Sequence, residues 1–74
     1  MLERLQEIVQ RFTGDTSLVL ESGTVLRTDL GLNSYELVEL VCKVEDAFDV
    51  EIPDRSIRKL KTVQHVLDYI EANG

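Results

Sequence analysis

The chain has 74 residues, enough for one small domain over residues 1–74 and too few for the deep cleft of a self-sufficient enzyme. Its 14 acidic and 8 basic residues give a formal net charge of −6, which argues against nucleic acid and anionic membranes as partners. Cys42 is the only cysteine and His65 the only histidine, so an intrachain disulfide and the usual four-ligand zinc site are excluded. The composition therefore favours a carrier or binding module whose partners present basic surfaces, although acidity can also serve solubility alone.

The chain shows no sign of membrane insertion or export. No apolar stretch approaches the ~20 residues of a membrane span, and the N-terminus lacks the basic and apolar regions of a secretory signal. We therefore expect a cytoplasmic monomer.

Residues 1–12 are predicted to form an amphipathic helix that ends near Gly14. Its apolar residues recur at i, i+3, i+4 and i+7, namely Leu5, Ile8, Val9 and Phe12. The connection over 13–33 is expected to be ordered and packed on the helices, because it is too apolar for a solvated tether. The apolar residues of this connection are Leu18, Val19, Leu20, Val25, Leu26, Leu30 and Leu32.

A second helix is predicted from Asn33 or Ser34 to about Phe48. Asn33 is a good N-cap, and Glu36 three residues later completes a pattern like a capping box. Its buried stripe is expected to contain Leu37, Leu40, Val41, Val44 and Phe48.

The remainder of the chain predicts a short helical turn and a last helix. Pro53 disfavours a helical conformation at Ile52 and is suited to the start of a turn over 54–58. Thr62 is predicted to cap the last helix, and His65 is predicted to lie on its surface. The fold class is therefore all-α, a small four-helix bundle with three main helices and a short third one. The relative direction of the first two helices is left open.

Ser34 is the residue best placed for chemistry. At the first turn of a helix, its hydroxyl is expected to be exposed beside free backbone N–H groups and the positive end of the helix dipole. A phosphate ester would be favourably placed there. The competing interpretation is that Ser34 only caps the helix.

A strip along the second helix is a candidate docking surface. At 100° per residue its acidic members share an outward face with two apolar neighbours. The candidate residues are Glu36, Val38, Glu39, Cys42 and Asp46. Apolar contact would supply area and charge would supply orientation, although an ordinary solvated face fits the pattern as well. Lys43 interrupts the acidic run, and a second, basic cluster over 55–61 is expected to be solvated.

Residues 29–40 read DLGLNSYELVEL, which resembles the acyl carrier protein signature D-L-G-x-D-S-L followed by an acidic amphipathic helix. The likeness continues through VEDAFDVEIPD at 44–54, LKTVQ at 60–64 and LDYI at 67–70. Residues 1–28 match the family only in layout. The combination of serine, acidic helix and Ile-Pro segment at these spacings is specific to the family.

The resemblance implies that Ser34 receives a covalent 4'-phosphopantetheine arm from coenzyme A through a phosphopantetheinyl transferase. The arm's thiol would hold acyl intermediates as thioesters for fatty-acid or related biosynthesis and present them to acyl-processing enzymes with basic docking surfaces. The carrier itself would not be an enzyme. By analogy, an acyl chain would be shielded by Leu40, Val44, Ile52, Ile57 and Leu60.

Some positions depart from the family pattern. Asn33 replaces the aspartate before the serine, and Tyr35 replaces the leucine after it. These changes suggest a specialised carrier that depends on particular partners. The alternatives are a polyketide or aminoacyl carrier and a carrier-like scaffold without the arm.

Overall fold

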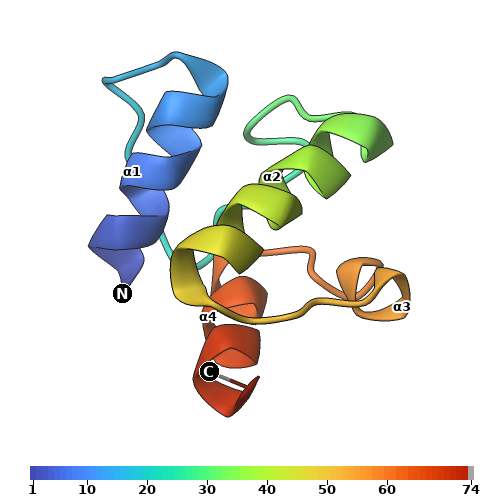
Figure 1. Ribbon diagram of the computed structural model, residues 1–74. Helices are drawn as coiled ribbons and strands as arrows, with labels where there is room; N and C mark the ends of the chain where they lie inside the picture. Colours follow the sequence, from blue (N-terminus) through green and yellow to red (C-terminus); the bar gives the residue numbers. More distant parts are fainter. Residues whose placement is uncertain (74) are drawn as a thin grey trace.

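The computed structural model describes residues 1–73 and contains four helices. They are α1 (Leu2–Thr13), α2 (Ser34–Phe48), α3 (Asp54–Ile57) and α4 (Val63–Asn73) (Figure 1). Within residues 1–73 there is no strand, only an isolated bridge between Val25 and Thr62. The all-α prediction is confirmed, and each predicted helix lies within a residue or two of its observed bounds. None of the described helices is long and apolar enough to span a membrane.

Helix α1 packs against α2 through its buried face, which contains Leu5 and Val9. The helix ends at Gly14, whose φ of 77° is the left-handed conformation that glycine adopts without strain. The Gly14 N–H donates to the carbonyl of Gln10 at 2.9 Å. The predicted end of the helix is therefore confirmed, together with its physical reason.

Helices α1 and α2 run antiparallel. The Arg4 guanidinium at the start of α1 donates a hydrogen bond to the carbonyl of Ala47 near the end of α2. It also lies 4.8 Å from the centre of the Phe48 ring, a cation–π contact. These contacts place the first turn of α1 beside the last turn of α2, as Figure 1 also shows. They decide the orientation that the sequence left open.

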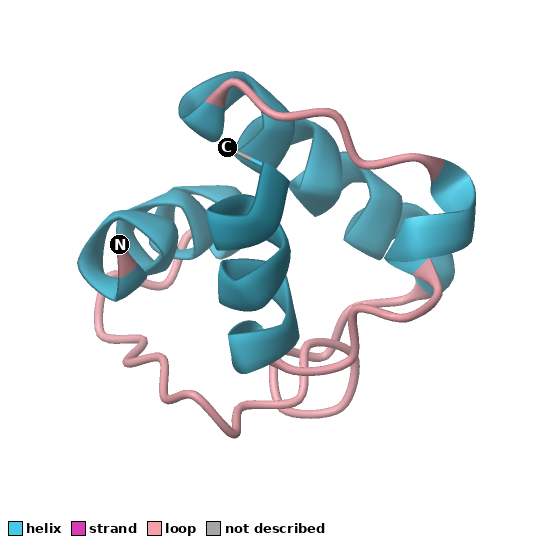
Figure 2. Cartoon of the chain, turned by 90° about the horizontal axis from the view of Figure 1, so that it is seen from below, coloured by secondary structure: helices cyan, strands magenta, loops and turns pink. Residues whose placement is uncertain are grey.

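The long connection between α1 and α2, drawn as a loop in Figure 2, contributes side chains to the core, as predicted. Its buried side chains are Leu20, Leu26 and Leu32. Two glutamines of α1 hold its first half, since Gln6 Oε1 accepts from the Leu20 N–H at 2.8 Å and Gln10 Nε2 donates to the Leu18 carbonyl at 2.8 Å. Val19 differs from the prediction, because its side chain is 70% exposed between two inward-facing leucines.

The segment between α2 and α3 is not helical and is anchored at Ile52. The Ile52 N–H donates to Glu45 Oε2 at 2.7 Å, and its side chain is buried. Pro53 then precedes the single turn of α3, where Ile57 is buried. Ile52 lies outside the helices, in agreement with the expectation that the residue before the proline is not helical.

The start of α4 is capped by two side chains. Thr62 Oγ1 accepts from the His65 N–H at 3.3 Å, as predicted for the cap. In return, His65 Nδ1 accepts from the N–H groups of Thr62 (3.3 Å) and Lys61 (3.2 Å). His65 is exposed as predicted, but it also completes the reciprocal arrangement of a capping box.

Replacement of His65 by alanine is expected to reduce the free energy of unfolding by about 1 kcal/mol, the typical cost of losing a helix cap. A His65→Gln variant retains a side-chain acceptor at the same position and is expected to stay close to the parent chain. Urea denaturation of the three proteins measures the difference. Equal losses in both variants would show that His65 acts through packing and not through its acceptor atom.

Candidate functional site

Ser34 is exposed at the first residue of α2, and the helix does not need its hydroxyl as a cap. The cap is Asn33, whose side chain accepts from the Glu36 N–H at 2.8 Å. The Glu36 carboxylate accepts in turn from the Asn33 N–H at 3.1 Å, which completes the predicted capping box. The interpretation of Ser34 as only a helix cap is therefore wrong, and its hydroxyl is left available at the surface.

The turn before α2 fixes the position of Ser34. Gly31 has a φ of 68°, a conformation that disfavours residues with a Cβ. The Leu32 N–H donates to the Arg27 carbonyl at 2.9 Å, and the Leu32 side chain is buried. With Leu32 held inward, the chain turns outward at Asn33 and exposes Ser34.

The surroundings of the Ser34 hydroxyl favour an anion. The first helical hydrogen bond of α2 runs from the Leu37 N–H to the Asn33 carbonyl, so the N–H groups of Ser34 and Tyr35 have no acceptor inside the helix. The positive end of the helix dipole lies at the same place. A phosphodiester on the Ser34 oxygen would therefore be stabilised by the backbone itself.

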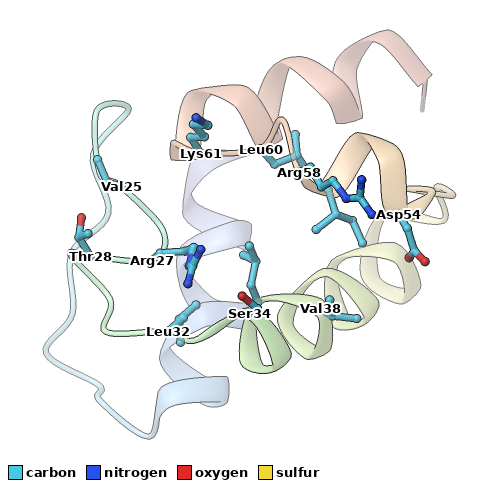
Figure 3. A pocket seen from close by; sticks show the side chains of 12 residues that line it. Val25, Arg27, Thr28, Leu32, Ser34, Val38, Asp54, Arg58, Leu60 and Lys61 are labelled. Carbon is cyan, nitrogen blue, oxygen red and sulfur yellow. The ribbon is translucent and has the colours of Figure 1, made fainter.

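Ser34 also lines a groove with a volume of about 950 Å³. The groove lies between the connection, the start of α2, and the α3 region up to the start of α4 (Figure 3). Its apolar side chains are Val25, Leu32, Leu37, Val38, Ile57 and Leu60, and its other lining residues are Arg27, Thr28, Ser34, Asp54, Arg58 and Lys61. An arm attached to Ser34 can thus reach a partly apolar groove without leaving its own domain.

The residues predicted to shield an acyl chain divide into two groups. Ile57 and Leu60 line the groove beside Ser34. Leu40, Val44 and Ile52, together with Leu60, surround an enclosed apolar void of about 10 Å³ in the core. Leu60 borders both spaces, and of the two only the groove has room for cargo, because the void holds no more than about 10 Å³.

The five predicted docking residues are not equivalent in the structure. Glu39, Cys42 and Asp46 are exposed, and Val38 is 42% exposed at the edge of the groove. Glu36 is half-buried and its carboxylate is engaged in the capping box. Four of the five predicted residues, Val38, Glu39, Cys42 and Asp46, are therefore available to a partner, and we call these four the docking face.

The sequence interpretation missed the basic side of the groove. Arg27 and Thr28 come from the connection, where no motif marks them. Arg58 and Lys61 are exposed, as expected for the basic cluster, and in addition they line the groove. Tyr35, which is 73% exposed next to Ser34, was recognised as a departure from the family and lies where a partner approaching the serine would meet it.

Comparisons with known proteins agree with this geometry. The family model for a phosphopantetheine attachment site matches residues 3–70. An acyl carrier protein from Trieres chinensis is 41% identical over 71 residues, covering 96% of this chain and 89% of that protein. One from Bdellovibrio bacteriovorus is 54% identical over 46 residues, covering 62% of this chain and 59% of that protein.

A solved structure of the acyl carrier protein from Enterococcus faecalis is also similar, with a TM-score of 0.75 and 28% identity. The match covers 97% of this chain and 95% of the other. Proteins of this kind carry a covalently attached 4'-phosphopantetheine and are carriers, not catalysts. They interact with the enzymes that process acyl groups. The chain belongs to the acyl carrier protein family.

Proposed function

We propose that Ser34 is the residue that carries the 4'-phosphopantetheine arm, and that the chain holds acyl groups on this arm for a biosynthetic pathway. The observation that supports this most directly is the exposed Ser34 hydroxyl, which is left unused by a helix cap that Asn33 and Glu36 complete. The arm, when attached, supplies a thiol that carries the acyl group as a thioester.

The residues of the chain itself would position the arm and keep its attachment point accessible. The backbone N–H groups at the start of α2 stabilise the negative charge of the phosphodiester. Leu32 and Gly31 hold the attachment point at the surface, where a transferase can approach it. A carrier tethered to its cargo raises the effective concentration of that cargo at any enzyme to which it docks.

Peptide mapping by tandem mass spectrometry tests this proposal. The chain is incubated with coenzyme A and a broad-specificity transferase, digested, and searched for the mass of the arm. We expect the modification on the peptide that contains Ser34 and on no other. An arm located on Ser22 or Ser56 would refute the assignment.

We propose further that the docking face binds enzymes with basic surfaces around their active-site entrances. Glu39 and Asp46 are exposed on α2, the helix that also carries the groove residue Val38. Complementary charge accelerates association and orients the partner, while a small interface allows rapid release.

Reversal of both charges by Glu39→Lys and Asp46→Lys is expected to slow association with a transferase by about tenfold or more at low salt, because electrostatic steering is lost. The matched control is Glu7→Lys with Glu71→Lys, which changes the net charge equally at exposed sites on α1 and α4. Stopped-flow association rates at several salt concentrations measure the effect. If the control pair slows association as much, net charge and not the docking face determines the rate.

We also propose that the chain is a cytoplasmic monomer that serves a specialised pathway. Asn33 and the exposed Tyr35 support specialisation, because they change the two positions that flank the attachment serine. Complementation tests it: a strain that lacks its main carrier is expected to grow poorly on this chain. Growth equal to that with the main carrier would show a general role in fatty-acid elongation.

A further inference from the structure

The groove beside Ser34 has a charge opposite to that of the protein as a whole. The chain has a formal net charge of −6. Yet the ionisable residues that line the groove are Arg27, Arg58 and Lys61 against the single carboxylate of Asp54. An apolar cargo alone would gain nothing from three cations along its binding groove.

These cations come from separate parts of the chain. Arg27 belongs to the connection between α1 and α2, whereas Arg58 and Lys61 belong to the segment between α3 and α4. In Figure 3, Arg58 and Lys61 lie across the groove from Ser34 with Leu60 between them, and the guanidinium of Arg58 lies on the side of Asp54. The groove thus combines apolar side chains beside the attachment point with positive charge at its far side.

We propose that the acyl group carried in this groove bears a carboxylate at its far end, so that its methylene segment contacts the apolar residues and its carboxylate meets Arg58 and Lys61. This inference rests on the proposed attachment of the arm to Ser34. Arginine and lysine form their strongest hydrogen bonds with ionised acceptors, and the walls of a groove reduce the screening of such pairs by water.

The phosphate of the arm itself is the other anion that these cations could meet. It would be bonded to the Ser34 oxygen, where the N–H groups at the start of α2 already provide partners. Arg58 and Lys61 lie on the opposite side of the groove. Their position therefore fits a group at the end of the cargo better than a group at its point of attachment.

The experiment compares two cargoes of five carbons each on ¹⁵N-labelled protein, loaded by a transferase from glutaryl-coenzyme A or pentanoyl-coenzyme A. The amide resonances of Arg58, Leu60 and Lys61 are compared with those of the protein that carries only the arm. We expect the glutaryl group to shift these resonances more than the pentanoyl group, and added salt to reverse the additional shift.

Variants identify the groups responsible. Arg58→Gln with Lys61→Gln is expected to abolish the shift specific to the glutaryl group. Lys59→Gln is the matched control, because Lys59 is an exposed cation between them that does not line the groove. It is expected to retain the shift.

Three results would overturn the inference: equal or larger shifts with the pentanoyl group, retention of the glutaryl-specific shift in the Arg58 and Lys61 double variant, or loss of that shift in the Lys59 variant. The intact mass of the protein, measured before the spectra are recorded, distinguishes these three results from failure of the proposed function. A chain that gains no arm at Ser34 contradicts the proposed function and this inference together, whereas a loaded chain without the glutaryl-specific shift contradicts this inference alone.

Discussion

Replacement of Ser34 by alanine is expected to abolish attachment of the arm and leave the fold unchanged. The helix cap belongs to Asn33 and Glu36, so α2 keeps both of its cap hydrogen bonds in the variant. Alanine is a better helix former than serine, and exposed substitutions usually change stability by less than about 0.5 kcal/mol. The variant would therefore lose attachment of the arm completely, although its fold is unchanged.

Transfer of a fluorescent analogue of the arm from coenzyme A measures this, with circular dichroism and thermal unfolding as checks on the fold. The matched control is Ser22→Ala, a substitution at an exposed serine of the connection. It is expected to be labelled like the parent chain. Labelling of the Ser34 variant, or loss of labelling in the Ser22 variant, would contradict the assignment of Ser34.

A second large effect is expected at Leu20, on stability. Leu20→Ala removes a side chain that is 3% exposed in the core, and such substitutions cost about 2–5 kcal/mol. A domain of this length has a total stability of only about 4–11 kcal/mol. The variant is therefore expected to lose a large part of its stability, although the substitution lies outside every helix.

The neighbouring residue provides the control. Val19 is 70% exposed, and Val19→Ala is expected to change stability by less than about 0.5 kcal/mol. Urea or thermal unfolding of both variants measures the contrast. Similar, small losses at both positions would mean that the connection is not part of the core.

The helices could be predicted from the sequence because the signals that define them are local. The capping box of Asn33 and Glu36 spans three residues, and Gly14 and Pro53 act on their immediate neighbours. The buried faces follow from the 3.6-residue period. Ser34 was singled out by its place at the start of a helix, which is a local property, and the arm was assigned to it by the resemblance of residues 29–40 to the acyl carrier protein signature.

Features that depend on residues far apart in the sequence could not be predicted. The antiparallel arrangement of α1 and α2 brings Arg4 to the carbonyl of Ala47 near the end of α2, 43 residues away. Gln6 and Gln10 look like ordinary surface residues until the connection folds back onto them. Arg27 becomes a groove residue only when the connection packs beside the α3 region. In each case the partner is chosen by tertiary packing, for which the sequence has no short-range signal.

The central claim, that this chain is an acyl carrier protein with its arm on Ser34, is tested most directly by intact mass. The purified chain is measured before and after incubation with coenzyme A and several phosphopantetheinyl transferases, alongside Asn33→Asp, which restores the family's usual residue. The account predicts that the parent chain gains the mass of one 4'-phosphopantetheine. No gain with any transferase, on a folded parent chain and on the Asn33 variant alike, would contradict it.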